Sequence, residues 1–388
     1  MIRGLLQGVV LTLLVNSPPA QAACESPWPL WQRFATTWVQ ADGRVLESSL
    51  QANHSTSEGQ AYALFFALVA NDRERFAHIW RWSRENLAGN DPHKLLPAWL
   101  WGQGKDGQWK VQDANSASDA DIWFAYALLE ADRLWGQADY RADALALLGQ
   151  IETQEVVAVP GLGPTLMPGP VGFVHPDHLW RLNPSYVPIP VLRRLAKAQP
   201  DGPWPQIVES SAKLLIEGGG HGFAADWVGY RGTSQTSGLF IPDPFKGDIG
   251  SYDAIRVYLW AGITAPADPL AKPILDALRG MARATAAKGL PPEKVSVTTG
   301  GTEGTGPFGF SAALVPYFQA SSEPWLAEQQ QRRALAALDT AAQGRPVPVY
   351  YDYMLSLFGL GWAEQRYRFA ADGQLEPSWE SACSVKAT

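Results

Sequence analysis

Helical periodicity dominates the chain. In the first periodic segment, apolar residues recur at i, i+3, i+4 and i+7, at Trp31, Phe34, Ala35 and Trp38. The same spacing recurs to the C-terminal end. It predicts helices near residues 28–40, 57–70, 73–88, 118–135, 138–152, 185–197, 205–217, 250–263, 268–287, 309–319, 323–342 and 350–364.

Long connections rich in glycine and proline separate these segments, for example at residues 157–164 and 299–307. Connections of this kind usually carry function. Neither a low-complexity linker nor a sequence repeat interrupts the series, so we expect a single all-α domain over residues 23–388. An even series of antiparallel helices around one core can close as an (α/α)6 barrel of six helical hairpins. Periodicity alone leaves closure open, but a helical solenoid would show self-similarity.

The N-terminus has the pattern of a signal peptide over residues 1–22. Arg3 supplies the positive start, an apolar run extends from Leu5 to Val15, and Ala20-Gln21-Ala22 is typical of a cleavage site. The apolar run is too short to span a bilayer. We therefore expect a periplasmic or secreted protein without a membrane anchor.

Two cysteines, Cys24 and Cys383, lie at the two ends of the mature chain. In an oxidising compartment a disulfide between them would close nearly the whole chain and contribute up to about 5 kcal/mol. Such a bridge needs Cα atoms within about 7 Å of one another. The sequence leaves both a bridge and two free thiols open.

Composition narrows the class of partner. A net charge of −7 with scattered Lys and Arg disfavours binding to nucleic acid or anionic membranes. With 46% hydrophobic and 18% charged residues, the chain can bury a large core. Most of its 17 tryptophans must lie in that core, but a minority in exposed positions would suit stacking on the apolar face of a sugar.

Three acidic positions stand apart from the solvated background. Glu58 opens a helix whose next turns are almost wholly apolar. Desolvation there would raise its pKa and let it act as a general acid, whereas interaction with the helix dipole would lower the pKa. Both interpretations fit the sequence.

The second acidic cluster lies in the segment from Asn115 to Trp123. Ser118 and Asp121 have the spacing of a capping box for the following helix, which would explain Asp121 structurally. Asp119 has no such role and is the functional candidate.

Asp253 is the third candidate. It lies at another helix start, with Arg256 one turn later. An arginine at that spacing would hold Asp253 ionised, as a general base requires. An ordinary surface pair would give the same spacing.

Other chemistries have weaker support. The pair His175 and His178 lies in a proline-containing loop without a third metal ligand. The Ser-x-x-Lys motif at 210–213 lacks its Lys-Thr-Gly companion, and the Gly-rich match at 304–309 lacks the βαβ context of a dinucleotide site. Acid-base catalysis by carboxylates remains, without a metal or organic cofactor.

The segment Ala117-Ser118-Asp119-Ala120-Asp121, followed by Leu128-Leu129-Glu130-Ala131, resembles the signature of glycoside hydrolase family 8. Within that family the chain is similar, over nearly its whole mature length, to the periplasmic endoglucanases associated with bacterial cellulose synthase. Further segments carry the resemblance, namely residues 56–60, 96–102, 159–163, 183–186 and 251–258.

The resemblance implies an (α/α)6 barrel with an open cleft across one end and minor β-strands around it. It also implies hydrolysis with inversion at the anomeric carbon, with Glu58 as general acid and Asp253 as general base. Asp119 would bind the sugar in the central subsite and help to place the water. The expected substrate-binding residues are Tyr62, Trp99, Trp101, Asn115, Trp180, Tyr186, Tyr252 and Arg256.

The expected activity is endo-1,4-β-D-glucanase action on cellulose during its synthesis and export. Contact with the synthase export complex is one expected partnership. Two alternatives stay open. The same fold could act on xylan, chitosan or mixed-linkage glucan, or the chain could be a catalytically silent glucan-binding protein of the export machinery.

Overall fold

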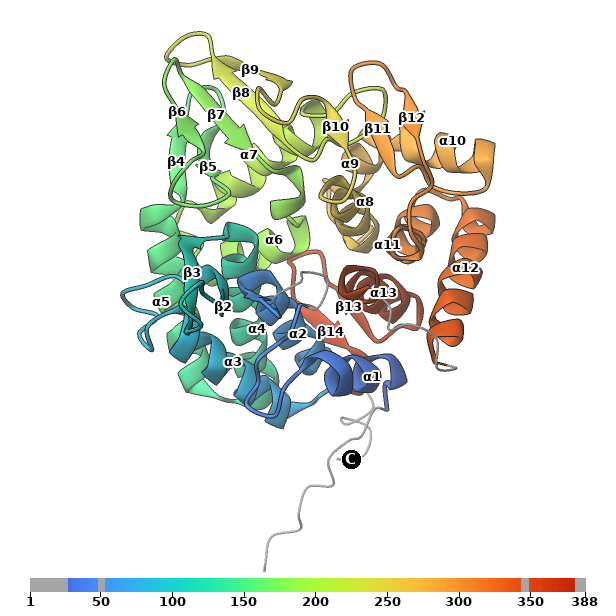
Figure 1. The fold of residues 1–388 in the computed structure, drawn as a ribbon. Coiled ribbons are helices and arrows are strands. Elements are labelled where there is room, and N and C mark those ends of the chain that lie inside the picture. The colour runs from blue at the N-terminus through green and yellow to red at the C-terminus, as the bar shows by residue number, and fades with distance from the viewer. Residues whose placement is uncertain (1–26, 48–52, 343–348, 381–388) are drawn as a thin grey trace, which may run out of the picture.

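Six inner helices form a ring in the computed structural model, which describes residues 27–47, 53–342 and 349–380. Figure 1 shows the ring with several of these helices seen nearly end-on. The inner helices are α2 (Ser57–Val69), α4 (Ser118–Trp135), α6 (Ile189–Ala198), α8 (Ala254–Ile263), α11 (Phe308–Ala320) and α13 (Tyr350–Ala363).

An outer layer of helices packs against this ring. Each inner helix contacts an outer neighbour, in the pairs α2 with α3, α4 with α5, α6 with α7, α8 with α9, α11 with α12 and α13 with α1. The outer helices are α1 (Pro29–Trp38), α3 (Arg73–Leu87), α5 (Ala138–Gln154), α7 (Trp204–Glu217), α9 (Ala271–Ala277), α10 (Arg279–Lys288) and α12 (Pro324–Ala342). The expected (α/α)6 barrel is confirmed.

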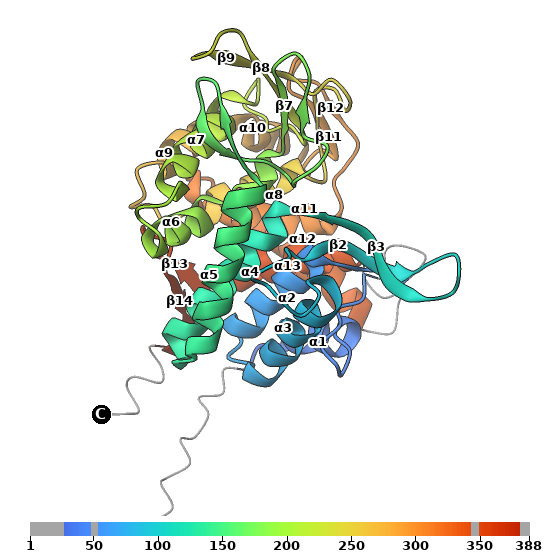
Figure 2. The same ribbon diagram turned by 90° about the vertical axis from the view of Figure 1, so that its left-hand side faces the viewer.

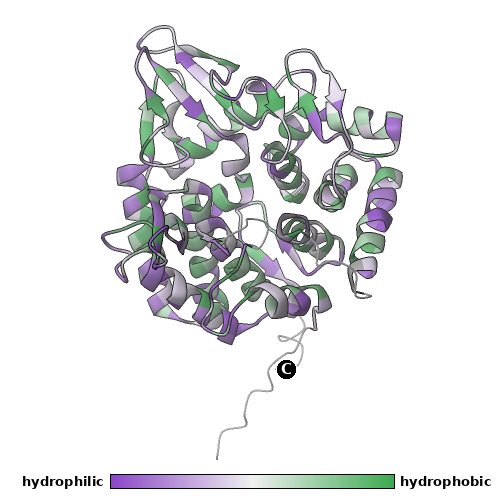
Figure 3. Cartoon of the chain, in the orientation of Figure 1, coloured by the Kyte–Doolittle hydropathy of each residue, from purple (hydrophilic) through white to green (hydrophobic). Residues whose placement is uncertain are grey.

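The centre of the barrel is filled by aromatic side chains, which we call the aromatic plug: Phe65, Trp123, Trp260 and Phe358. Phe358 lies 5.7 Å from Phe65, 5.6 Å from Trp123 and 5.0 Å from Trp260, between ring centroids. All four are at most 2% exposed. Figure 3 shows the inner helices largely in hydrophobic colours and the outer α12 largely hydrophilic. The plug joins α13 to α2 and so closes the ring.

Short antiparallel sheets lie around the helical barrel. Their strands are β1 (Ser55–Thr56), β2 (Ala98–Gln103) and β3 (Trp109–Ser116); β4 (Val156–Val159) and β5 (Gly163–Leu166); β6 (Val174–His175), β7 (Leu179–Leu182), β8 (Val228–Gly232) and β9 (Gly238–Pro242); β10 (Ile249–Gly250), β11 (Lys294–Ser296) and β12 (Thr302–Glu303); β13 (Tyr367–Phe369) and β14 (Leu375–Pro377). Figure 2 shows β2, β3, β7, β11 and β12 on one side of the barrel and β13 and β14 on the other.

The predicted helices differ from the observed ones mainly where proline or a side-chain contact interrupts them. The segment 185–197 divides into a 3₁₀ helix, η1 (Pro184–Tyr186), and α6, because Pro188 and Pro190 lie at the junction. The segment 268–287 divides at Leu278 into α9 and α10. The connection 157–164 is ordered as the β4–β5 hairpin, which sequence periodicity did not reveal.

Some expectations concern residues that the structure does not describe. The signal peptide at 1–22 and the two cysteines, Cys24 and Cys383, lie outside the described ranges, so the disulfide stays a prediction. Within those ranges, no helix combines the length and apolar character that crossing a membrane requires.

Candidate active site

A cleft of about 630 Å³ opens where α2, α8 and α13 begin. Its walls combine carboxyl groups, aromatic rings and one guanidinium group. The lining residues are Glu47, Thr56, Glu58, Gly59, Tyr62, Trp99, Leu100, Tyr186, Tyr252, Asp253, Arg256, Pro307, Val349, Tyr350, Tyr351, Asp352 and Met354. A polar floor beneath aromatic walls is the surface that a sugar needs.

Glu58 reaches the cleft from the first turn of α2, and it is the only residue of that helix that is not buried. The helix begins there because the hydroxyl of Thr56 accepts a hydrogen bond from the Gly59 N–H at 3.1 Å. The carboxyl group of Glu58 has two donors. Trp99 Nε1 donates to Oε1 at 3.1 Å, and Ser57 Oγ donates to Oε2 at 3.3 Å.

The pKa of Glu58 is raised from its usual value to about 8. Desolvation is the largest cause, and the neighbouring charge of Asp119 is the next. Glu58 therefore holds a proton at neutral pH. Of the two interpretations open from the sequence, the structure favours desolvation over the helix dipole.

Arg256 connects two acidic residues of the site, Asp253 and Asp119. Its Nη2 donates to Asp253 Oδ1 at 2.8 Å and to Ser185 Oγ at 2.9 Å. Its Nη1 donates to the Tyr62 hydroxyl at 3.1 Å and to Asp119 Oδ2 at 3.3 Å. The residue Arg256 as a whole is only 6% exposed. One buried cation therefore compensates two carboxylates, and the predicted contact with Asp253 is present.

Asp253 is the N-cap residue of α8 and lines the cleft. Besides the ion pair with Arg256, its Oδ2 accepts a hydrogen bond from Trp227 Nε1 at 3.2 Å. Both oxygens of Asp253 thus have a hydrogen-bond donor.

The turn before α8 is fixed by Asp226. Its Oδ1 accepts hydrogen bonds from the backbone N–H groups of Ser251, Asp253 and Ala254, at 2.7, 3.1 and 2.8 Å. Its Oδ2 accepts a further bond from Ser251 Oγ at 2.6 Å. These contacts explain why α8 begins at Ala254 and not at residue 250 as the periodicity predicted. They also fix the backbone that carries Asp253.

Asp119 lies beneath the cleft at the N-terminus of α4 and is fully buried. Its Oδ1 accepts a hydrogen bond from the Ala120 N–H at 2.9 Å, and Oδ2 contacts Tyr62 and Arg256. Its pKa is raised to about 6, because desolvation outweighs the opposing effect of Arg256. The site thus combines a protonated carboxyl with ion-paired carboxylates, which is what concerted acid-base chemistry needs.

The sequence profile of the glycosyl hydrolases family 8 matches residues 3–365. The chain is 53% identical over 384 residues to an endoglucanase of Pseudomonas fluorescens strain SBW25, across 96% of both chains. It is 48% identical over 383 residues to an endoglucanase of Xanthomonas axonopodis pv. citri, across 98% of this chain and 97% of that one. The chain belongs to glycosyl hydrolases family 8.

The structure is also similar to the crystal structure of an endo-1,4-D-glucanase from Vibrio fischeri ES114. The TM-score is 0.85 at 40% identity, and the match covers 91% of this chain and 99% of that one. This family 8 chain is therefore a glycoside hydrolase of the endoglucanase class.

The cleft of the family 8 enzyme brings together most of the residues expected from the sequence. Those that line it are Glu58, Tyr62, Trp99, Tyr186, Tyr252, Asp253 and Arg256, with Asp119 directly beneath. Trp99 and Tyr252 are 39% and 44% exposed, so their rings are free to meet a ligand.

Three expected residues do not line the cleft. Trp101 stacks on Trp109 at 5.2 Å in the β2–β3 hairpin. The Asn115 side chain exchanges hydrogen bonds with the backbone of Val171. Trp180 is 7% exposed and lies in β7. Their role in substrate binding stays a prediction.

The capping box predicted from Ser118 and Asp121 is wrong. The helix α4 begins one residue earlier than that motif requires, with Ala117 as the N-cap and no side-chain cap. The Ser118 hydroxyl has no hydrogen-bond partner among the described residues. Asp121 is instead fully buried and interacts with Glu155, from the end of α5.

Sequence reasoning missed Asp226, Trp227 and Tyr351. Tyr351 lines the cleft, and its hydroxyl donates to the Tyr252 backbone carbonyl at 2.5 Å. The contacts of Asp226 and Trp227 with the turn of Asp253 join residues 25 to 28 positions apart. Helical periodicity does not indicate contacts over such separations. Only the neighbouring Asp226-Trp227 pair in a glycine-rich loop could have indicated them.

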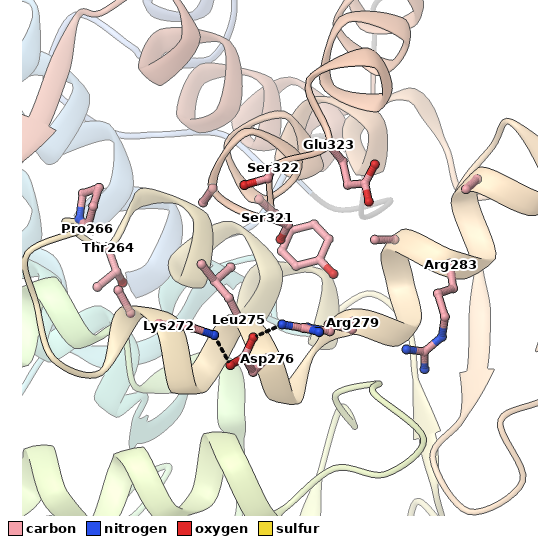
Figure 4. Close-up of a pocket in the computed structure, with 15 residues that line it drawn as sticks. Thr264, Pro266, Lys272, Leu275, Asp276, Arg279, Arg283, Ser321, Ser322 and Glu323 are labelled. Carbon is pink, nitrogen blue, oxygen red and sulfur yellow. Dashed lines mark hydrogen bonds and ion pairs between the residues drawn. The ribbon is translucent and has the colours of Figure 1, made fainter.

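A second cavity of about 790 Å³ lies away from this chemistry, among α9, α10 and the ends of α8 and α11. Figure 4 shows Asp276 there between Lys272 and Arg279, to both of which it is ion-paired. Thr264, on its wall, follows the last residue of α8, whereas Asp253 precedes the first. Ten helical residues separate the two sites along that helix, roughly 15 Å.

Proposed function

We propose that this enzyme is an inverting endo-1,4-β-D-glucanase that hydrolyses internal linkages of cellulose. Glu58 is the general acid, Asp253 is the general base, and Asp119 positions the sugar whose bond is cleaved. The observation that carries this assignment is the contrast between the two carboxyls of one cleft. Glu58 has a pKa raised to about 8, whereas Asp253 is ion-paired with Arg256.

The acid step follows from the state of Glu58. Its proton passes to the glycosidic oxygen as the bond from that oxygen to the anomeric carbon breaks. The leaving chain then departs as a neutral alcohol. Trp99 Nε1 and Ser57 Oγ, which already contact the carboxyl oxygens, stabilise the carboxylate that this transfer leaves behind.

The base step follows from the position of Asp253. One of its oxygens accepts a proton from water while the water oxygen bonds to the anomeric carbon from the face opposite the leaving group. The configuration is therefore inverted. Arg256 and the Asp226 contacts hold the Asp253 turn in place, so that little reorganisation is needed when the water attacks.

Aromatic residues support binding of a β-linked glucan along the cleft. Trp99 and Tyr252 line the cleft and are partly exposed, and the Tyr186 ring centroid lies 5.7 Å from the guanidinium carbon of Arg256. Equatorial substituents give each β-1,4 glucose unit two flat apolar faces that stack on such rings. A cleft formed at one end of a barrel suits internal segments of a polymer.

The setting that we propose is the periplasm or the outside of the cell, where the enzyme would trim cellulose as it is made and exported. The signal-peptide pattern at residues 1–22 supports export. The link to cellulose synthesis and to its export complex rests on the resemblance described above.

Purified mature protein with carboxymethylcellulose tests the activity. We expect a rapid fall in viscosity with few new reducing ends, and proton NMR of the first products of cellohexaose should show the α-anomer. A slow fall in viscosity with many reducing ends would contradict endo action. First products in the β-configuration would contradict inversion.

Two further results would redirect the proposal. Faster hydrolysis of xylan, chitosan or mixed-linkage glucan, compared at equal enzyme concentration, would assign a different β-linked substrate. Binding to cellulose without any hydrolysis would favour the glucan-binding alternative, and the ionised and protonated carboxyls of the cleft would then have no catalytic use.

A further inference from the structure

Two carboxyl groups that the proposed mechanism does not use lie behind Asp119. Asp121 comes from the first turn of α4, and Glu155 follows the last residue of α5. Both residues are completely buried. The two carboxyls are close enough for one to donate a hydrogen bond to the other when it carries a proton. Burial of two acids side by side is costly unless their charge is reduced.

The donors around this pair are too few for two ionised carboxylates. Ser116 Oγ donates to Glu155 Oε1 at 2.6 Å. Ser116 also lies near Asp121, but its hydroxyl has one hydrogen, which goes to Glu155. The oxygens of Asp121 and Oε2 of Glu155 therefore have no further donor in the described parts of the chain. An ionised carboxylate only accepts hydrogen bonds, so two of them in contact cannot bond to each other without a proton between them.

We propose that Asp121 and Glu155 share one proton and act as a positioning pair that holds Asp119 beneath the cleft. The shared proton supplies the missing donor, and the pair then carries one negative charge instead of two. Desolvation raises the pKa of both groups, that of Glu155 to about 8, which agrees with a retained proton at neutral pH.

The pair lies where three segments of the chain meet. Ser116 ends β3, Asp121 belongs to α4, and Glu155 links α5 to β4. The Glu155 carbonyl also accepts from the Met167 N–H at 2.8 Å. Because Asp119 is two residues from Asp121 on the same helical turn, a displacement at the pair moves the carboxyl that contacts Arg256.

The charge of the pair also bears on the cleft. The groups that act on it are Ser116 from β3 and Asp119 from α4. The charge of Asp119 raises the pKa of both members of the pair, and it also raises that of Glu58. A second negative charge behind Asp119 would disfavour the ionised form of Asp119 that Arg256 compensates. The shared proton removes that charge.

Infrared difference spectroscopy tests for the proton directly. Glu58 is itself protonated at neutral pH, so the measurement uses Glu58→Gln as the background. At pH 7 we expect a carbonyl stretch of a protonated carboxylic acid that shifts in D₂O and disappears when Asp121→Asn is added. Asp139→Asn, which changes an exposed carboxyl of α5, is the matched control and should leave the band unchanged.

A band that persists in the Asp121→Asn protein, or no such band at pH 7, would overturn the proposal. In the second case both carboxyls would be ionised, with a bound water as their donor. This measurement needs no substrate, so its outcome is independent of the proposed function.

Activity tests the positioning role, and this part rests on the proposed function. The amide in Asp121→Asn supplies a permanent donor to Glu155, so we expect kcat to stay within about threefold of wild type. Asp121→Leu has similar volume but no hydrogen bond, and should lower kcat roughly 10- to 100-fold with little change in KM, as small misplacements of catalytic groups do.

Equal kcat values in the Asn and Leu variants would contradict a positioning role. Should the Leu variant fail to fold, Glu155→Gln replaces it as the second case, because its amide also supplies a donor and kcat should again be retained. An inert wild type that still shows the carboxylic acid band would refute the proposed function and leave the shared proton intact.

Discussion

Glu58 and Asp253 begin two non-adjacent inner helices of the same barrel, α2 and α8, yet their surroundings differ. Both lie at helix N-termini, where the helix dipole favours negative charge. Asp253 also has Arg256 and Trp227 as donors, whereas Glu58 has a desolvated position and the charge of Asp119 behind it. The helix terminus is common to both, so the difference between them comes from the remaining surroundings, which are desolvation at Glu58 and an ion pair at Asp253.

The comparison teaches that one fold position can serve either as acid or as base. Desolvation of one carboxyl, together with an ion pair between the other and a buried cation, separates their roles. Among the described residues, Arg256 forms ion pairs with Asp253 and Asp119 but not with Glu58. The two carboxyls of the cleft therefore differ both in the desolvation of Glu58 and in the ion pair that Arg256 gives Asp253.

The largest effects should come from removing either group. Glu58→Gln and Asp253→Asn should each lower kcat on cellohexaose by roughly 10² to 10⁴. The two variants should separate on a cellooligosaccharide with an acidic phenol as leaving group, because such a phenol departs without a proton. Steady-state rates should recover for Glu58→Gln and stay low for Asp253→Asn. Recovery of the rate in both variants would contradict the assignment of Asp253 as the general base.

The Asp226 contacts should give the next largest effect. Asp226→Ala frees the backbone that carries Asp253, so we expect kcat to fall roughly 10- to 100-fold while KM changes little. Asp248→Ala is the control, because Asp248 accepts bonds from Ser296 and Thr298 in a neighbouring loop and not from the turn of Asp253. An equal loss in both variants would mean that general loop order is responsible.

The pH dependence of activity follows from the raised pKa of Glu58. The acid must be protonated, so kcat/KM should fall as the pH rises through about 8, by about tenfold for each further unit. A profile of kcat/KM from pH 6 to 10 checks this. The fall should be absent with the aryl substrate that needs no acid, and its persistence there would assign the alkaline limb to another group.

A smaller effect is expected from Trp99→Phe. The substitution keeps a ring for stacking but removes the donor to Glu58 Oε1. We expect a loss of about 1 kcal/mol, or roughly fivefold in kcat/KM, which is usual for one hydrogen bond. Kinetics on cellohexaose measure it, and Trp109→Phe, at an exposed ring of the hairpin that does not line the cleft, is the matched control.

We expect the smallest effect in the pH dependence of the free energy of unfolding. Because the folded pKa of Glu58 exceeds its ordinary value of 4.5, the native state binds more protons than the unfolded state between about pH 4.5 and 8. The free energy of unfolding should therefore fall as the pH rises across this window. Urea titrations should show a shallower fall for Glu58→Gln, and an unchanged slope would mean that Glu58 is not protonated in the folded state.

The sequence predicted features that repeat locally. The helices follow from apolar spacing, and the ion pair of Asp253 with Arg256 follows from an i, i+3 relation on one turn. The starting residues of α2 and α4 were also expected within one residue. Such contacts are fixed by helical geometry, so they can be inferred before the fold is known.

Contacts made across the barrel could not be predicted in this way. Local spacing in the sequence predicts Asp121 as half of a capping box, whereas its partner in the structure, Glu155, follows the next helix. Asp226 reaches the Asp253 turn from a separate loop. The raised pKa of Glu58 depends on burial by several elements together, and the sequence left its direction open.

The aromatic plug determines how a polymer can approach this enzyme. Phe65, Trp123, Trp260 and Phe358 pack against one another inside the barrel and are buried, so the described residues close its centre with side chains beneath the cleft. A glucan strand must therefore be laid down sideways and lifted off the same way. For such a geometry the ends of the strand are irrelevant, and any stretch that comes within reach of the surface can become the site of a cut.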